Sequence, residues 1–372
     1  MNDPCWPRTL RWIAGLGVPT LLFWATWHQA DPAGGLCLIA QAGPLSLLAL
    51  APFALVLGAD ALGWRALLVG RSRGRAPLGA LFAARACGEA VSQSLPSAGV
   101  AGEAASAWLV SRRSGIPLGE AIGSLAARRL LLLPGHGLVL AMAALAAAAG
   151  APVPRPLAAA AGVAALSLLL AAAAAARVMR HASPFARLHV VLRRSSWARV
   201  RDWVGAGSIR LRDADREARR VLDLPPRQRA HACAWFTLVY LAESLETLAL
   251  LRLLGAEVTP WQVLAFEPLV SLLRALVFFV PAGLGVQDLG YVALLRLVGT
   301  PRAAAFGAAF VALKRLKELA WIAGGWSLLL SAQAGLDPKE AVGERTTTDP
   351  LHLRNPQPDH SDAPGRARAA GA

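Results

Sequence analysis

Ionisable side chains inside otherwise apolar stretches are the residues of this sequence most able to do chemistry. Each costs about 2.5 to 3.5 kcal/mol at the centre of a bilayer-inserted helix, so it should pair, line water or bind a charged ligand. Grouped cations favour an anion, a phosphate above all, because a guanidinium binds phosphate through two hydrogen bonds. The candidate anion-binding cations are Arg85, Arg274, Lys314 and Arg315. The candidate carboxylates for pairing or proton coupling are Glu89, Glu103, Asp288 and Glu318.

Residue spacing predicts partners for some of these charges. Arg85 and Glu89 are four residues apart, as are Lys314 and Glu318, so each pair can meet on one helix face. Structural neutralisation is the alternative to ligand binding for either pair. The arginines at 128–129 are expected to extend along apolar surface to the membrane interface.

Metal and cofactor sites have no clear pattern in this sequence. Glu243 and Glu246 are three residues apart and could form a metal or proton site, but no Glu-x-x-His motif matches them. The cysteines and histidines are isolated, and there is no phosphate-binding loop, nucleophile elbow or dinucleotide fingerprint. We therefore expect no metal and no cofactor.

The candidate residues belong to a motif that occurs twice. Segments 95–103 and 280–288 both begin with an apolar residue and a proline, and both carry an acidic residue seven positions after that proline. In each copy a Gly-x-Pro triplet and then a pair of cations follow. Chance likeness between Ala-rich and Gly-rich segments is the alternative to a true repeat. The residues expected to break the helices are Pro96, Gly99, Gly102, Pro281, Gly283 and Gly285.

Long apolar runs must position these motifs. Hydrophobic residues make up 55% of the chain, and runs of about 20 apolar residues, the length that crosses a bilayer, recur along it. The predicted fold class is an all-α polytopic integral membrane protein with about six spanning helices. Two broken re-entrant segments, 77–110 and 261–298, are expected to form an inverted repeat. The predicted spans are 12–28, 36–58, 118–149, 156–176, 231–254 and 303–331.

The net charge of +15 lies between the apolar runs. Residues 177–229 hold fourteen arginines against five acidic residues, with no aromatic pattern for stacking on nucleic-acid bases. Basic loops face the cytoplasm, so we expect a multi-pass protein of the bacterial cytoplasmic (inner) membrane with both termini cytoplasmic and no nucleic-acid partner. The first broken segment would then enter from the cytoplasm and the second from the outer face. Residues 200–221 should form an amphipathic helix on the cytoplasmic leaflet.

The predicted domain boundaries follow the same pattern. One membrane domain covers 1–331, and the polar tail 332–372, which has no apolar periodicity, should be disordered. Basic residues precede the first apolar run, but no convincing small-residue cleavage site follows, so we expect an uncleaved first helix. Within the domain, repeat 1 covers about 77–149, the cytoplasmic basic loop 177–230, and repeat 2 about 261–331.

Together these motifs resemble the lysylphosphatidylglycerol synthase transmembrane-region family, also called the flippase-like domain family, over roughly residues 10–331. The Ala-rich helices and the second motif are similar to its hopanoid-biosynthesis-associated members. The resemblance implies a lipid-handling membrane domain, and the proposed activity of such domains is to move a lipid or lipid-linked intermediate between leaflets. Asp288 stands where Glu is common. The residues that carry the resemblance are Arg85, Glu89, Pro96, Glu103, Arg274, the run 279–288, Lys314, Arg315 and Glu318.

A flippase-like transporter is the leading hypothesis, in which the cations meet a headgroup while the carboxylates position them or couple protons. The expected partner is a membrane lipid with an anionic headgroup or a hopanoid-type lipid, and a homo-oligomer is left open. A lipid-modifying transferase working at the basic loop is the alternative from another class. An accessory subunit of a lipid-synthesis complex is the third. The sequence favours a transporter over an enzyme, because only a polar tail, and no acyltransferase-like domain, follows residue 331.

Overall fold

The computed structural model describes residues 31–68, 70–94, 99–182, 187, 190, 208–277, 283 and 285–334. Every regular element within these residues is a helix, which confirms the all-α prediction. The predicted first span 12–28, most of the tail 332–372, Pro96 and Pro281 lie outside the described residues. The elements discussed below belong to one compact unit that ends at Leu330, apart from the last four residues of the final helix.

The described chain begins with two short helices, a longer helix and a basic helical turn. They are α3 (Pro32–Ala42), the 3-10 helix η2 (Gly43–Leu50), α4 (Pro52–Leu67) and α5 (Gly70–Arg75). The prediction of one spanning helix over 36–58 is therefore wrong. Gly43 ends α3 with a φ of 60°, and the following Pro44 has no backbone N–H to continue the helical hydrogen bonds.

Each of the two predicted broken segments forms a pair of helices. The first pair is α6 (Leu78–Ser94) and α7 (Gly99–Ser114), and the second is α14 (Pro260–Leu276) and α15 (Val286–Leu297). Gly283 and Gly285 lie in the second break with φ of 62° and 80°, a backbone region that residues with a Cβ avoid. Glycine is therefore required where α15 begins.

The first helix pair packs backbone to backbone. A Cβ at Gly88 of α6 would lie 2.0 Å from Ser106 Oγ, and a Cβ at Gly102 of α7 would lie 2.3 Å from Gly88 O. Helices in membranes associate through small residues of this kind, because lipid provides no hydrophobic drive for helix contact. Gly102 was predicted to break a helix; instead it lies inside α7 and permits the close approach of α6.

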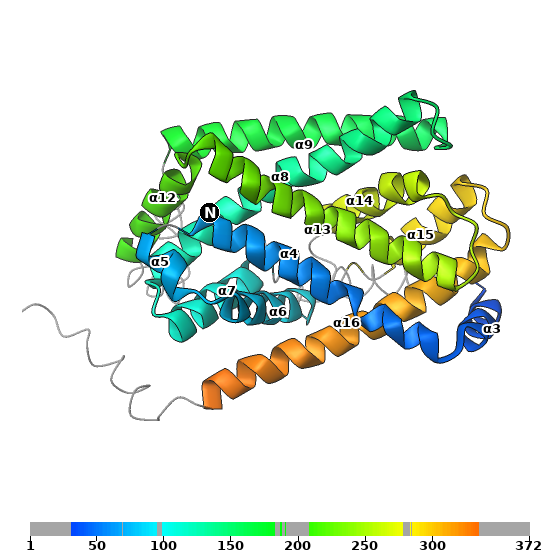
Figure 1. Ribbon diagram of the computed structural model, residues 1–372, viewed down its shortest axis with the longest axis horizontal. Coiled ribbons are helices and arrows are strands. Elements are labelled where there is room, and N and C mark those ends of the chain that lie inside the picture. Colours follow the sequence, from blue (N-terminus) through cyan, green and yellow to red (C-terminus); the bar gives the residue numbers. More distant parts are fainter. Residues whose placement is uncertain are drawn as a thin grey trace, which may run out of the picture. The chain divides into compact units, whose positions relative to one another are not determined.

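Three helices in the described part of the chain are long and apolar enough to cross a membrane, judged by length and composition. They are α8 (Leu118–Ala148), α9 (Arg155–His181) and α13 (Pro226–Leu253). At 1.5 Å per residue a 27-residue helix extends about 40 Å, more than the hydrocarbon thickness of about 30 Å. These helices match the predicted spans 118–149, 156–176 and 231–254, and α8 packs against both α9 and α13 (Figure 1).

A further long helix, α16 (Ala303–Ala334), matches the predicted span 303–331 but carries charged residues over 314–318. Small residues bring it close to its neighbours. A Cβ at Gly325 would meet Ala86 O of α6 at 2.6 Å, and one at Gly307 would meet Val292 of α15 at 2.6 Å. Helix α16 therefore contacts one helix of each broken pair.

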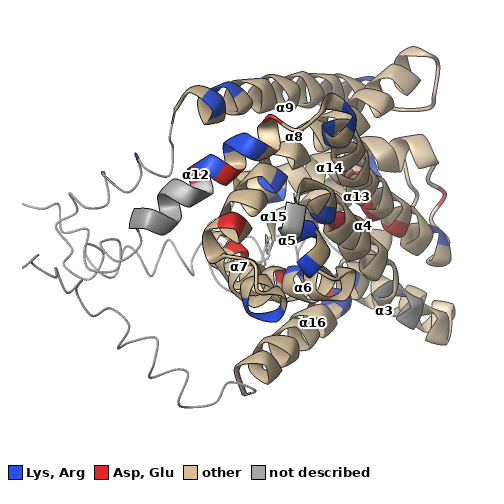
Figure 2. Cartoon of the chain, turned by 60° about the vertical axis from the view of Figure 1, so that its left-hand side comes forward, with Lys and Arg blue, Asp and Glu red and all other residues tan. Residues whose placement is uncertain are grey.

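The helix α12 (Ser208–Leu222) forms within the predicted basic loop 177–230. Ala218 and Val221 are fully buried, and Val221 belongs to a core cluster that includes Phe236 of α13. The predicted amphipathic helix 200–221 is confirmed from residue 208 onwards, but this part of its apolar face packs on protein rather than on a leaflet. Figure 2 shows charged residues gathered on α12 and α5, whereas most of α9 carries none.

A core of aromatic and aliphatic side chains supports the charged parts of α14, α15 and α16. Phe266 of α14 and Phe310 of α16 are fully buried in it. The Tyr291 ring of α15 meets the Phe310 ring edge-on, with ring centroids 4.7 Å apart. This packing fixes the direction in which the Tyr291 hydroxyl points, and that hydroxyl belongs to the site described next.

Candidate functional site

Asp60 of α4 is the centre of a buried charge cluster, hereafter the Asp60 cluster, formed with Arg85, Glu103 and Arg128. Arg85 of α6 donates from Nε to Asp60 Oδ2 at 2.8 Å, and Arg128 of α8 donates from Nε to Asp60 Oδ1 at 2.6 Å. A second hydrogen bond joins Arg128 Nη2 to Asp60 Oδ2. Sequence reasoning missed Asp60, although an acidic residue inside an apolar helix was an available signal.

Glu103 of α7 completes the compensation of charge in the Asp60 cluster. Arg128 Nη1 lies 3.2 Å from Glu103 Oε1, and Arg129 Nε lies 2.6 Å from the same oxygen. The prediction that Arg128 reaches the membrane interface is wrong, because two carboxylates hold it inside the bundle with a side chain only 4% exposed. The Arg129 side chain is 53% exposed, as an interfacial residue would be.

Arg85 is held from several sides. Its Nη2 lies 3.8 Å from Glu89 Oε2, which confirms the predicted pair on α6, and its Nη1 lies 3.6 Å from Glu103 Oε2. The same Nη1 donates to Ser106 Oγ at 3.2 Å. With Asp60 also bound, the guanidinium of Arg85 is committed to protein groups in this structure.

The predicted repeat forms the same ion pair in both copies. Glu103 accepts from Arg129 at 2.6 Å, and Asp288 accepts from Arg315 at 2.6 Å. In each copy the acid lies in the helix after the break, and the cation lies in the long helix that follows. Asp288 also accepts from the backbone N–H of Gly285 at 3.0 Å and so caps α15. The inverted orientation of the two copies stays a prediction.

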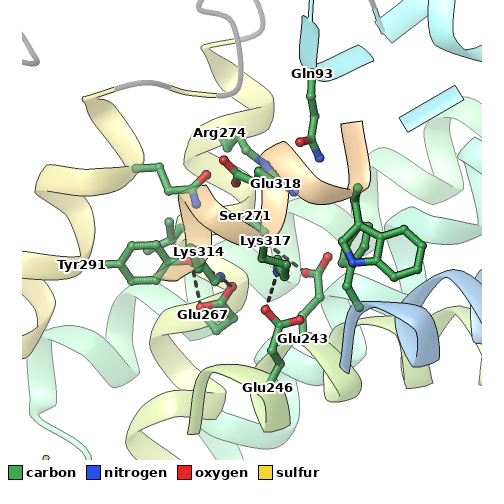
Figure 3. Close-up of a pocket in the computed structure, with 14 residues that line it drawn as sticks. Gln93, Glu243, Glu246, Glu267, Ser271, Arg274, Tyr291, Lys314, Lys317 and Glu318 are labelled. Atoms are coloured by element: carbon green, nitrogen blue, oxygen red, sulfur yellow. Dashed lines mark hydrogen bonds and ion pairs between the residues drawn. The ribbon is translucent and has the colours of Figure 1, made fainter. Parts of the chain in front are cut away.

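A polar pocket, hereafter the Arg274 pocket, lies among α13, α14, α15 and α16, with one side chain each from α4 and α6 (Figure 3). It offers about 20 Å³ to the centres of water molecules, which is room for about one or two waters. The predicted site residues that line it are Arg274, Lys314 and Glu318. The other lining residues are Phe53, Gln93, Glu243, Glu246, Glu267, Val270, Ser271, Gln287, Tyr291, Lys317 and Trp321.

Lys314 binds Glu267 of α14 rather than Glu318. Its Nζ lies 2.6 Å from Glu267 Oε1 and donates to the Tyr291 hydroxyl at 2.6 Å. Glu318 instead accepts from Arg315 Nη1 at 2.6 Å. The predicted Lys314–Glu318 pair is therefore wrong, because the partner of Lys314 comes from a neighbouring helix. The positive charges of Lys314 and Arg315 are both compensated in this arrangement.

Three buried acceptors of residues that line the Arg274 pocket have no hydrogen-bond partner among the described residues: Gln93 Oε1, Glu246 Oε2 and Gln287 Oε1. Glu246 uses its other carboxylate oxygen for an ion pair with Lys317. Gln287 is only 3% exposed. Buried polar atoms are paired in the great majority of cases, so these three atoms mark places where a further hydrogen-bond donor fits.

Arg274 and Glu243 are the charged lining residues that form no ion pair within the described chain. Arg274 projects from α14 into the pocket (Figure 3). Glu243 of α13 accepts a hydrogen bond from Ser271 Oγ at 3.2 Å. The other cations of the pocket, Lys314 and Lys317, are bound to carboxylates. Arg274 is therefore the pocket cation best able to receive an anion.

The predicted site residues divide between these two places. Arg85, Glu89 and Glu103 lie at the Asp60 cluster, whereas the remaining predicted ions lie in or beside the Arg274 pocket. Sequence reasoning missed Gln287 and Tyr291, since neither is charged, but both follow the second break by less than two helical turns. Across the described ranges, no group of three His, Cys, Asp or Glu side chains could hold a metal ion.

Comparison with known proteins gives one match. The family model described as "Lysylphosphatidylglycerol synthase TM region" matches residues 12–313 of the chain. No curated protein and no solved structure matches the chain. The matched membrane region and the long apolar helices α8, α9 and α13 identify a multi-pass membrane protein.

Proposed function

Since this chain belongs to the lysylphosphatidylglycerol synthase transmembrane-region family, as its sequence predicted, we propose that it moves a membrane lipid or lipid-linked intermediate between the two leaflets. Family membership by itself gives a role related to membrane lipids. The proposed cargo carries an anionic headgroup. A hopanoid-type lipid is the more specific alternative that the sequence resemblance suggests.

One observation carries the proposal: Arg274 extends into a polar pocket and forms no ion pair among the described residues. A charge at membrane depth is costly unless it is compensated, so such residues mark the path of a substrate or ion. A guanidinium can bind a lipid phosphate through two parallel hydrogen bonds. The nearby acceptors, Glu246 Oε2 and Gln287 Oε1, can in turn accept from headgroup hydroxyls.

The pocket must widen before it can hold a headgroup. Its free space of about 20 Å³ fits about one or two waters, which is less than a phosphate with its glycerol needs. Gly283 and Gly285, which lie between α14 and α15, have φ of 62° and 80°, outside the α-helical region. We assign the opening movement to these two glycines, because discontinuous helices supply such gates in transporters.

The other predicted headgroup cations receive supporting roles in this proposal. Lys314 lines the pocket and adds positive potential while it stays bound to Glu267. Arg315 and Arg85 do not line the pocket, and both are held by carboxylates. They position the helices of repeat 2 and repeat 1, respectively. The bacterial cytoplasmic membrane, with both termini on the cytoplasmic side, is the proposed location.

Headgroup translocation can be measured with the purified full chain in vesicles that contain fluorescent phosphatidylglycerol. A membrane-impermeant quencher then reports how fast inner-leaflet lipid reaches the outer leaflet. We expect Arg274→Gln to abolish most of the protein-dependent rate. The matched control is Arg252→Gln, which makes the same change at an exposed position at the end of α13, away from the pocket. It should keep the wild-type rate.

Equal rates for Arg274→Gln and wild type would overturn the assignment of the site. A wild-type rate no faster than that of protein-free vesicles would overturn translocation of this lipid. Mass spectrometry of the vesicle lipids distinguishes a transporter from a lipid-modifying transferase. A transferase would generate a new lipid product, whereas a transporter leaves the lipids chemically unchanged.

A further inference from the structure

We propose that the Arg274 pocket carries a proton together with the anionic headgroup, and that Glu243 holds this proton. The inference rests on the proposed function, because it adds the coupling ion to the same site. It is carried by the pairing of charges around Glu243 and by the acceptors that the pocket leaves without donors.

Three of the pocket's carboxylates already have a cation. Glu267 binds Lys314, Glu246 binds Lys317, and Glu318 binds Arg315. Glu243 forms no ion pair within the described chain, and its hydrogen bond from Ser271 comes from a neutral hydroxyl. Its charge is balanced at longer range, chiefly by Arg274, which attracts it more strongly than any other cation nearby.

Other charged groups around Glu243 either attract or repel the negative charge of its carboxylate. Lys314 and Lys317 of α16 attract its negative charge, and Glu267 of α14 repels it. Glu246 and Glu318 line the same pocket, whereas Glu89 of α6 acts on Arg274. The other titratable groups nearby are Tyr240 on α13, His136 of α8, which stacks on Tyr240, and Tyr291 of α15.

Binding of an anion at Arg274 changes this balance. A phosphate bound to the guanidinium uses the positive charge that stabilised the Glu243 carboxylate, and it adds a negative charge inside a region of low dielectric constant. The carboxylate then accepts a proton from solvent, forming an O–H bond, and returns it to solvent when the lipid leaves. Because linkage is reciprocal, a protonated Glu243 must also strengthen binding of the anion at Arg274.

The pocket suits a proton better than a metal ion. The described residues offer no group of three metal ligands, and the free space of about 20 Å³ admits about one or two waters that can deliver a proton. Protonation turns Glu243 into a hydrogen-bond donor. Glu246 Oε2 and Gln287 Oε1 line the same pocket as acceptors without partners, and Gln287 is more than nine-tenths buried.

The test uses the full chain in vesicles that contain fluorescent phosphatidylglycerol and a trapped pH-sensitive dye. We expect wild-type protein to move protons with the lipid and to speed up as pH falls, by up to about tenfold per unit because one proton is taken up per headgroup. Glu243→Gln, a neutral mimic of the protonated acid, should move lipid at a rate independent of pH without moving protons. The matched control, Glu257→Gln, lies at an exposed position outside the pocket and should behave as wild type.

Each result of this test either supports or overturns proton coupling at Glu243. Wild-type lipid movement without proton movement overturns the coupling and leaves the proposed translocation intact. Lipid movement that is absent from wild type overturns both. If Glu243→Gln does not fold, the dye signal of the wild-type protein still shows whether protons move with the lipid. Glu243→Asp, which keeps a titratable carboxyl, should retain proton movement. A pH dependence that persists unchanged in folded Glu243→Gln assigns the proton to another group and overturns the role of Glu243.

Discussion

The aliphatic part of the Arg274 side chain lies against Gly283, so closely that a Cβ added to the glycine would come within 3.0 Å of Arg274 Cγ. Gly283 lies in the break before α15, and Arg274 lies in the last turn of α14. Gly283, which belongs to the second copy of the repeated motif, therefore leaves room for the aliphatic part of the Arg274 side chain and so positions this cation in the pocket. This contact connects the helix break, which the sequence made visible, to the proposed headgroup site.

Gly283→Ala should reduce lipid translocation by displacing Arg274. The substitution places a Cβ in the left-handed region, at a cost of about 1 to 2 kcal/mol, and also forces the stem of Arg274 to move. Gly299→Ala is the matched control, because Gly299 also has a positive φ, of 76°, but has open space around it. Both variants should lose similar thermal stability in detergent, and Gly283→Ala alone should lose transport. Equal transport by the two variants would contradict the positioning role.

Removing the charge of Asp60 should strongly destabilise the bundle. Asp60→Asn leaves Arg85 and Arg128 buried without their main counter-charge, and breaking a buried ion pair costs about 3 to 5 kcal/mol. Asp223→Asn is the comparison, because its side chain is 71% exposed and pairs with Arg180 only at 4.0 Å. Such surface pairs contribute about 0 to 1 kcal/mol. Thermal unfolding followed by circular dichroism would refute this prediction if both variants melted alike.

The two equivalent ion pairs of the repeat should differ in strength. Arg315 is 19% exposed whereas Arg129 is 53% exposed, so solvent screens the Glu103–Arg129 pair more. Double-mutant cycles with Asn or Gln at each position should give a larger coupling free energy for Asp288–Arg315, within about 0.5 to 3 kcal/mol. Unfolding of the four variants of each cycle measures it. A larger coupling for Glu103–Arg129 would contradict the prediction.

Gly102→Ala should loosen the contact between α6 and α7. Its new Cβ would lie 2.3 Å from Gly88 O, and overpacking of this kind costs about 1 to 3 kcal/mol. Gly99→Ala is the control at the start of the same helix, where an added Cβ meets nothing within 4 Å. Thermal unfolding in detergent should separate the two variants. A stability of Gly102→Ala equal to that of Gly99→Ala would show that α6 and α7 do not approach this closely.

Local properties of the sequence were sufficient for much of the fold. Apolar length predicted α8, α9, α13 and α16, because spanning helices require long apolar runs. Proline and glycine predicted that each re-entrant segment forms two helices, since these residues disrupt helical hydrogen bonding. The error at 36–58 arose because Gly43 and Pro44 interrupt a run whose hydropathy is continuous.

The sequence by itself determined which residues carry charge at membrane depth and where the helices break, because hydropathy and backbone preference act over a few neighbouring residues. Only the tertiary structure decided which charges meet. Arg128 pairs with Asp60 inside the bundle, and Lys314 pairs with Glu267 of a neighbouring helix rather than with its predicted partner. Arg274 forms no ion pair among the described residues. Ion pairing depends on distances between side chains of different helices, and helix packing sets those distances.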